Sequence, residues 1–448
     1  MACCFVEHDE RPTTSNIAIA TVSAVRILFD PDMTFKEKPE GKTMDKVKKA
    51  DAAAVENESK ALAQAAEKPY FAGIDIVKIL ALILVVCIHF YLYNGFYYFS
   101  ITNSSAIGPI AFRWVAYSCV PLFMISTGYL MKNKTFSAKF YAGLIRIIAI
   151  YVIISIICIK FKEHHFHEVF TPWKILKGYL EFNNAQYGWY INYYIAIFLI
   201  IPFLNLAING CKTSWQKFFL VAATVFITIF ARSFYLGFNQ NDQIKAVPDY
   251  LEGAWPIAYY LTGAFIRDCH PKRNVRNKLM ILAAFALSLS FLTYSSYKHT
   301  LSNDVNDNFF LSRHFNQYGA YPVYAVAVCI FLMLFDITTK NKGVKFVLRQ
   351  LSGLTLGTYL ISYIFDNMFY NGWRLSENST HHGGFNQKYI EVGDRFAHWY
   401  EIIPKVFICS LICGFLIHKL YDLCTFLVKK VAAILKSKTS GEAAKTKK

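Results

Sequence analysis

Charged residues are scarce in this sequence of 448 residues. Asp, Glu, Lys and Arg make up 17% of it, whereas hydrophobic residues make up 55%. An average soluble domain has roughly 25% charged residues. A single soluble core this apolar would have too little polar surface to stay dissolved. The composition therefore excludes most soluble proteins and indicates a chain embedded in lipid.

The sequence also lacks any CxxC pair, although it contains 11 cysteines. None of them lies in a segment that we expect outside the cell, so we expect neither a disulfide framework nor a zinc site. Free cysteines most often behave as small apolar residues in packed interiors. We therefore predict no metal centre and cysteines that pack between helices.

A basic start followed by an apolar stretch is absent from the N-terminus, so the sequence predicts no signal peptide. Residues 1–68 are polar, and residues 34–68 are rich in Lys, Glu and Ala. This composition predicts a disordered cytoplasmic tail. Met44 opens a polar stretch within it and is an alternative natural start.

Apolar runs long enough to cross a bilayer alternate with polar loops over residues 69–428. They predict an all-α transmembrane bundle of about ten helices. The expected spans are about 73–93, 108–131, 141–160, 189–208, 216–236, 254–267, 279–297, 318–336, 354–371 and 400–428.

The net charge of +17 is compatible with nucleic-acid binding or with membrane orientation. No basic stripe with interleaved aromatic residues marks a nucleic-acid surface. The basic residues instead gather in alternate loops, as the positive-inside rule requires. We therefore expect a multi-pass plasma-membrane protein with both termini in the cytoplasm and a basic tail at 429–448. The inner loops contain Lys132, Lys134, Lys139, Lys212, Lys217, Arg267, Lys272, Arg273, Arg276, Lys278, Lys340, Lys342, Lys345 and Arg349.

The loops expected outside are longer and carry Trp, Tyr, His and Asn. Aromatic surfaces with hydrogen-bonding groups suit a carbohydrate, but the same aromatic residues also serve as interfacial anchors. Composition leaves both interpretations open. These loops are 161–188, 237–253, 298–317 and 372–399, and the candidates for the acceptor side are Trp189, Tyr190, Glu252 and Trp255.

Three ionisable residues, Asp75, Lys78 and His89, interrupt the first apolar span. At about 100° per residue, Lys78 lies about 60° from Asp75, and His89 about 20° from Lys78. They therefore share one helix face, with about 16 Å along the axis between Lys78 and His89. Such residues are costly in lipid, so this polar stripe should face the bundle interior or a wet cavity.

Each residue of the stripe has a structural and a functional interpretation. Asp75 and Lys78 can pair with each other at the inner interface, or they can support a site. His89 can be a hydrogen-bonded structural residue or a general base, since imidazole titrates near neutrality. Arg146, near the inner end of the third span, can bind a phosphate. It can equally be one of the basic residues that flank a span on its inner side.

The ordered set of motifs resembles the acyltransferase-3 family of integral membrane O-acyltransferases, which modify surface polysaccharides and peptidoglycan. The pattern of an Asp, then a basic residue, then a His after ten intervening residues is similar to the first helix of that family. Further segments that resemble family landmarks are residues 120–130, 140–151, 188–205 and 351–362. The resemblance spans about residues 70–428. The second Arg that many members carry near Arg146 is absent, and Ser362 stands where members often have His.

This resemblance implies acetyl-CoA, or another acyl-CoA, as a cytoplasmic donor substrate, with no permanently bound cofactor. It implies a hydroxyl of a cell-surface polysaccharide, or of its lipid-linked precursor, as the acceptor. Arg146 and Lys78 would then contact the donor phosphates, and His89 would act as the general base. An acyl-His intermediate is the alternative, because His can itself be a nucleophile.

Two other functions also fit a polytopic chain. A transporter or flippase of lipid-linked sugars or acyl groups would line its passage with the same polar stripe. Such folds contain internal repeats or paired broken helices, and the sequence shows neither. A non-catalytic membrane partner of a glycan-assembly complex would instead use the basic tails as docking segments.

Overall fold

Helices make up almost all of the structure, a computed structural model that describes residues 70–94, 96, 104–230, 247–271, 274–302, 315, 317–370 and 398–445. No strand occurs among these residues, in agreement with the predicted all-α class. The predicted tail 1–68 and most of the predicted outer loops 237–253, 298–317 and 372–399 lie outside the described residues. The elements are α3 (Ala72–Tyr93), η2 (Ser104–Ala106), α4 (Ile107–Tyr117), α5 (Cys119–Met131), α6 (Ala138–Tyr141), α7 (Gly143–Phe166), α8 (Pro172–Leu180), α9 (Trp189–Gly210), α10 (Ser214–Val225), the π-helical turn η3 (Phe226–Phe230), η5 (Asp249–Ala254), α12 (Trp255–Cys269), α13 (Val275–Ser302), α14 (Tyr321–Leu334), α15 (Lys342–Gly353), α16 (Thr355–Tyr370) and α18 (Trp399–Lys445).

Six helical stretches among the described residues are long and apolar enough to cross a membrane. They are Ala72–Tyr93, Ser104–Met131, Ala138–Phe166, Trp189–Gly210, Val275–Lys298 and Trp399–Val431. Ser214–Phe230 and Tyr321–Leu334 are shorter apolar helices beside them. The chain is therefore a multi-pass membrane protein. Every one of the ten predicted spans overlaps a helix, but the number of crossings stays a prediction.

The predicted span 108–131 is not one helix, because α4 and α5 are separated at Ser118. Pro121 explains the break, since proline has no N–H group and its ring clashes with the carbonyl one turn earlier. The hydroxyl of Ser118 donates to the carbonyl of Val115 at 2.6 Å and satisfies part of the broken turn.

The predicted outer loop 161–188 is largely helical. Helix α7 continues to Phe166 and ends at His167, whose backbone is left-handed (φ 53°). Helix α8 then begins at Pro172, and the side chain of Thr171 accepts a hydrogen bond from the backbone N–H of Lys174. The loop between α8 and α9, residues 181–188, follows.

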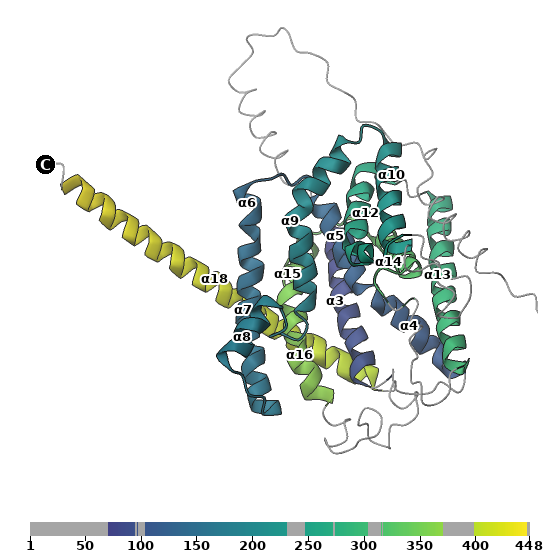
Figure 1. The fold of residues 1–448 in the computed structure, drawn as a ribbon, viewed down its shortest axis with the longest axis horizontal. Coiled ribbons are helices and arrows are strands. Elements are labelled where there is room, and N and C mark those ends of the chain that lie inside the picture. The colour runs from purple at the N-terminus through teal and green to yellow at the C-terminus, as the bar shows by residue number, and fades with distance from the viewer. Residues whose placement is uncertain are drawn as a thin grey trace, which may run out of the picture.

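The predicted tenth span and the basic tail form one helix, α18, of 47 residues. This helix crosses the bundle obliquely, and its C-terminal part extends well beyond it (Figure 1). It packs mainly against α16, and also against α3 and α7. The predicted tail therefore continues the helix for most of its length.

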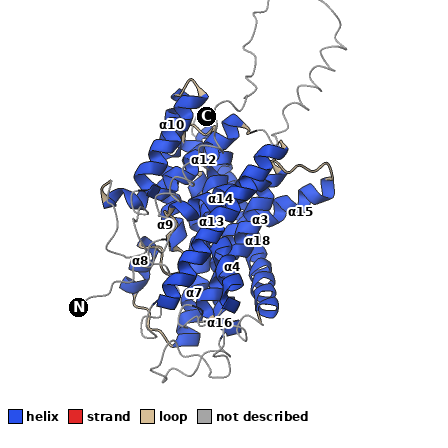
Figure 2. Cartoon of the chain, turned by 90° about the vertical axis from the view of Figure 1, so that its right-hand side faces the viewer, coloured by secondary structure: helices blue, strands red, loops and turns tan. Residues whose placement is uncertain are grey.

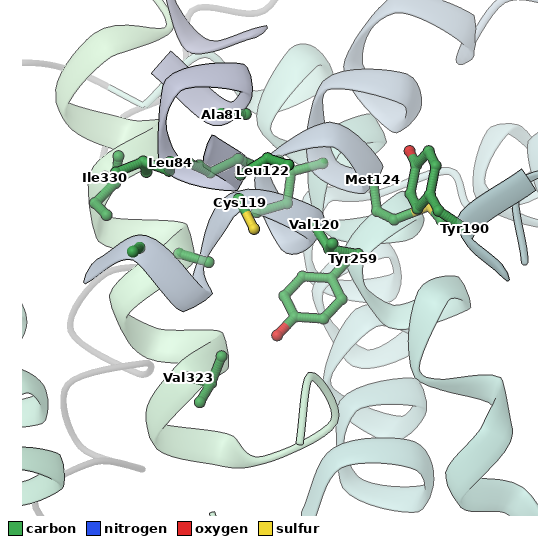
Figure 3. Packing of buried hydrophobic residues seen from close by; sticks show 14 of the residues in the cluster. Ala81, Leu84, Cys119, Val120, Leu122, Met124, Tyr190, Tyr259, Val323 and Ile330 are labelled. Atoms are coloured by element: carbon green, nitrogen blue, oxygen red, sulfur yellow. The ribbon is translucent and has the colours of Figure 1, made fainter. Parts of the chain in front are cut away.

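Two glycines allow α5 and α12 to cross in close contact. A Cβ atom on Gly128 would overlap the carbonyl of Tyr260, and one on Gly263 would overlap the carbonyl of Ile125. Small residues at such crossings let membrane helices pack backbone to backbone. Around this crossing, α3, α5, α12 and α14 bury the main apolar cluster, part of which Figure 3 shows at Leu84, Leu122 and Ile330.

Polar contacts join the helices at one end of the bundle, which we call the basic end. The ammonium groups of Lys132 and Lys217 both contact the carboxylate of Asp268, the latter at 2.6 Å. Asn205 on α9 donates to the carbonyls of Met131 and Lys134 at 2.8 and 2.7 Å. The end of α5, the start of α10 and the end of α12 therefore meet at the basic end. Burial is the largest cause that lowers the pKa of Lys132, to about 8.

Candidate active site

The polar stripe on α3 begins near the basic end with Asp75 and Lys78. Both residues contact the same third side chain, that of Ser352 at the end of α15. The hydroxyl of Ser352 donates a hydrogen bond to Oδ1 of Asp75. Lys78 Nζ in turn donates to the hydroxyl of Ser352 at 3.4 Å. The sequence left open whether Asp75 and Lys78 pair within α3 or support a site, and the structure places Ser352, at the junction of α15 and α16, between them.

Lys78 also lines a cavity of about 300 Å³ between α3, α5, α7, α9 and α16. Arg146, the second predicted donor-binding residue, lies on the wall of the same cavity. The sequence alone could not show that Lys78 and Arg146 line one cavity. Their positions there are compatible with the prediction that both contact the donor. The remaining lining residues are Phe123, Ser126, Thr127, Leu130, Met131, Ile147, Ile150, Tyr190, Ile191, Tyr194, Gly353, Thr355, Leu356, Tyr359 and His418.

His418 on α18 orients the guanidinium group of Arg146. Nη2 of Arg146 lies 3.2 Å from Nδ1 of His418, and the guanidinium carbon lies 5.6 Å from the ring centroid of Tyr421. A guanidinium group has only donors, so Nδ1 of His418 accepts. Gly357 on α16 allows this approach, because a Cβ there would press against the His418 ring. Arg146 is thus held at the cavity while it remains partly open to its surroundings.

His89 lies at the other end of the stripe, where it meets an acidic residue of α16. Its Nδ1 lies 3.2 Å from Oδ2 of Asp366. The side chain of Asp366 is fully buried, and that of His89 is 12% exposed. The two atoms are in contact, but the ring is not aligned for a strong N–H···O bond. Catalytic hydrogen bonds are often long or poorly aligned before substrate binds.

Tyr187, from the loop before α9, completes this group. Its hydroxyl donates to Oδ2 of Asp366 at 2.6 Å, and its ring stacks on His89 with centroids 3.9 Å apart. Burial, with the nearby Asp366 carboxylate as the next cause, raises the pKa of Tyr187 well above its usual range. The phenol therefore stays protonated and serves as a donor.

A hydrogen bond between His89 and Asp366 would select one tautomer of His89. An ionised carboxylate only accepts hydrogen bonds, so such a bond requires the proton of a neutral His89 to be on Nδ1. Nε2 is then the basic nitrogen. Among the described residues, Oδ1 of Asp366 has no hydrogen-bond partner, so the carboxylate has acceptor capacity left for an approaching N–H. The group can accept a proton at Nε2 and stabilise the imidazolium that results.

Tyr359 connects the cavity with the His89 group. It lines the cavity, and its ring centroid lies 6.5 Å from that of His89. Its hydroxyl donates to the carbonyl of Tyr187 at 2.6 Å. The cavity that Lys78 and Arg146 line and the imidazole of His89 are therefore neighbours across one aromatic ring.

The predicted acceptor-side residues divide into two places. Trp189 stacks on Tyr318 at 5.7 Å, and Trp255 packs against the same Tyr318 at 5.5 Å. Tyr190 instead lines the cavity that holds Lys78 and Arg146. Glu252 is half-buried in η5, just before Trp255. The structure thus unites the two tryptophans and places Tyr190 beside the predicted donor residues.

Sequence reasoning missed Asp366, His418, Tyr187 and Ser352. A signal was present for the first two, because each is an ionisable residue inside a predicted apolar span. No comparable signal marks Tyr187 or Ser352, which are ordinary loop and helix-end residues in the sequence. Ser362, where family members often have His, donates to the carbonyl of Tyr359 at 2.8 Å within its own helix.

Comparison with known protein families identifies the family of this chain. An acyltransferase domain family matches residues 71–419, which is most of the chain. The protein is a member of the acyltransferase-3 family. This integral membrane acyltransferase is not significantly similar to any curated protein or solved structure in the searches. The matched region begins one residue before α3 and includes Asp75, Lys78, His89, Arg146, Asp366 and His418, whereas Tyr421 lies just beyond it.

The described residues contain no group of three or more His, Cys, Asp or Glu side chains that could hold a metal ion.

Proposed function

We propose that this acyltransferase moves an acetyl or other acyl group from cytoplasmic acyl-CoA to a hydroxyl of a cell-surface polysaccharide or its lipid-linked precursor. One observation carries the proposal. His89, held by Asp366 and Tyr187, lies one aromatic ring away from a cavity that presents Lys78 and Arg146. Acyl transfer from a phosphorylated thioester donor requires two parts. One is a base, and the other is a cavity with cationic side chains that binds the donor.

The donor enters from the basic end in this proposal. Arg146 suits a phosphate group because a guanidinium matches phosphate oxygens with two parallel hydrogen bonds. Lys78 adds a point charge on the wall of the same cavity. The long pantetheine arm then follows the apolar cavity toward Tyr359, so that the thioester arrives beside His89. The reach of about 16 Å from Lys78 to His89 along α3 suits such an extended arm.

His89 acts as the general base on the acceptor hydroxyl. Nε2 takes the proton, the acceptor oxygen bonds to the thioester carbonyl carbon, and the carbon–sulfur bond breaks. The imidazolium then returns the proton to the leaving thiolate, which gives a free thiol and an ester. Asp366 stabilises the imidazolium between these steps. In the alternative sequence Nε2 itself attacks the thioester, and an acyl-His intermediate passes the group on.

The acceptor approaches from the opposite end, where Trp189 and Trp255 gather around Tyr318. Rings of this kind provide the apolar faces of a sugar with stacking surfaces. Because Lys and Arg concentrate at the basic end, we assign that end and both termini to the cytoplasm of the plasma membrane.

A labelling experiment tests this orientation in a cysteine-free background. A cysteine at the exposed Asn183 should react with an impermeant maleimide on intact cells, and one at the exposed Lys342 should react only after permeabilisation. Ser352 is unsuitable as a probe because it is buried against Asp75. The reverse labelling pattern would place the donor site outside and refute the proposal.

The chemistry is tested with two substitutions of His89. His89→Gln keeps a hydrogen-bonding side chain but cannot accept a proton at neutral pH, and His89→Ala removes both properties. We expect both variants to fold and bind acyl-CoA while glycan acylation falls about 100- to 10,000-fold, the usual effect of a positioned base. A structural His would tolerate Gln better than Ala. Near-normal acylation by His89→Gln would exclude the base, and His398 or His314, the latter outside the described residues, would be examined next.

A further inference from the structure

Helix α15 differs from the spanning helices in its length and in the distribution of its side chains. Its 12 residues begin after Asn341, whose side chain accepts hydrogen bonds from the N–H groups of Gly343 and Val344 at 2.8 and 3.2 Å. It is too short to cross a bilayer. It projects from the side of the bundle, across the direction of the long helices (Figure 2).

One face of α15 is basic and the other is apolar. At about 100° per residue, Lys342, Lys345 and Arg349 fall within about 60° of one another. The apolar residues fall within about 100° on the other side, and they are Val344, Val347, Leu348 and Leu351. A short helix with this pattern is typical of one that lies in the membrane interface.

The apolar side is only partly covered by the rest of the chain. Val344 and Val347 are 44% and 51% exposed, whereas Leu348 and Leu351 are half-buried. Phe346, which is 64% exposed, lies about 40° from Lys342, beside the basic face. Lys342 and Arg349 are exposed as well. Apolar and basic side chains exposed together at the basic end fit one surface, a lipid layer with anionic headgroups.

The same helix is connected to the donor cavity. The guanidinium carbon of Arg349 lies 4.5 Å from the ring centroid of Tyr70, whose hydroxyl is 3.5 Å from the carbonyl of Lys345. Ser352 holds both Asp75 and Lys78, and the next residue, Gly353, lines the cavity. A displacement of α15 would therefore move the partner of Lys78.

We propose that α15 binds anionic phospholipid headgroups through Lys342 and Arg349, and that this contact holds Ser352 where it positions Lys78 for the donor. The second half rests on the proposed function, because it concerns affinity for acyl-CoA. The first half stands without it. The lipid composition of the membrane would thereby change the affinity of the donor site for acyl-CoA through α15, a helix that does not contact the substrate.

The lipid contact is tested without any acyl transfer. Phe346→Trp places a fluorophore on the exposed part of α15, and the parent protein in the same nanodiscs provides the background of native tryptophans. We expect brominated phosphatidylglycerol at 20% of the lipid to quench this fluorophore at least twice as strongly as brominated phosphatidylcholine at 20%. With Lys342→Gln and Arg349→Gln added, the two brominated lipids should quench the fluorophore equally. The control substitutions Lys174→Gln and Lys177→Gln on α8 should leave the stronger quenching by phosphatidylglycerol unchanged. Equal quenching in the unsubstituted helix would overturn the proposal.

The effect on the donor site is tested by the KM for acetyl-CoA in the two kinds of nanodisc. Anionic lipid repels the anionic donor, so a general electrostatic effect would raise KM. We expect KM instead to fall about threefold or more in phosphatidylglycerol, and the Lys342→Gln, Arg349→Gln variant to lose this fall. Lys139→Gln, an exposed charge at the same end, should keep it.

Ser352→Ala should retain the lipid preference of the fluorophore but lose the fall in KM. If Ser352→Ala keeps the fall, or if KM rises in anionic discs, the coupling is wrong. If no acyl transfer is found in any disc, the proposed function fails while the quenching result still decides whether α15 binds anionic lipid.

Discussion

Nδ1 of His89 on the first membrane helix lies 3.2 Å from Oδ2 of Asp366, whose side chain is fully buried. A hydrogen bond between these two atoms would place the imidazole proton on Nδ1 and leave Nε2 free for chemistry. The acid that contacts His89, the base in the proposed function, is thus supplied by α16 and not by the stripe on α3. The first prediction follows from this contact.

Asp366→Asn should lower kcat by about 100-fold or more without changing the KM for acyl-CoA. Asn has nearly the same shape, but its amide can donate to Nδ1 and so favour the tautomer with the proton on Nε2, as in serine proteases whose triad Asp is replaced. Glu401→Gln, an exposed acid on α18, is the matched control and should be unaffected. Normal kcat in Asp366→Asn would show that the contact has no part in catalysis.

Tyr187 contributes a hydrogen bond and a stacked ring, and two substitutions separate them. Tyr187→Phe keeps the ring on His89 and should lower kcat about tenfold, the lower range for a hydrogen bond to a charged group. Tyr187→Leu should lower it further. Tyr179, on α8 of the same outer segment, packs edge-on against Tyr151, so Tyr179→Phe should behave as wild type. Identical rates for Tyr187→Phe and wild type would assign Tyr187 to packing alone.

Lys78→Met and Arg146→Gln should raise the KM for acyl-CoA about tenfold while kcat changes little. Removing an interaction that is equal in the ground state and the transition state has this signature. Lys139→Gln, at the same end but outside the cavity, measures the general loss of positive charge. A fall in kcat at constant KM would move both residues from donor binding to the chemical step.

The crossing of α5 and α12 gives a prediction on stability. Gly128→Ala should lower the unfolding temperature in detergent or abolish expression, because the added methyl group overlaps the backbone of Tyr260. Overpacking of this kind typically costs about 1–3 kcal/mol or more. Nothing lies near a Cβ at Gly108 in α4, so Gly108→Ala should be tolerated. Equal stability of the two variants would contradict the close crossing.

Helical periodicity was sufficient to place Asp75, Lys78 and His89 on one face, because that relationship is local to one helix. It also placed the first apolar span correctly, over 73–93 against Ala72–Tyr93 in the structure. The break at Ser118 was readable in principle from Pro121. Pattern alone did not reveal α8, because its nine residues lie in a polar, aromatic stretch.

Contacts between distant segments were beyond the sequence. Asp366 stood out as an acid in an apolar span, but no periodicity relates α16 to α3, so its pairing with His89 could not be derived. The same holds for Ser352 between Asp75 and Lys78, and for His418 beside Arg146. The sequence could predict which residues are costly to bury, but not which partner offsets that cost.

Tyr359 belongs both to the wall of the cavity and to the surroundings of His89. In the proposed function, its ring would stand between a thioester in the cavity and water near His89. An enzyme that waits for a scarce acceptor benefits from such a barrier, because the loaded donor would otherwise be hydrolysed. Replacing this ring with a small side chain should turn the acyltransferase partly into a thioesterase.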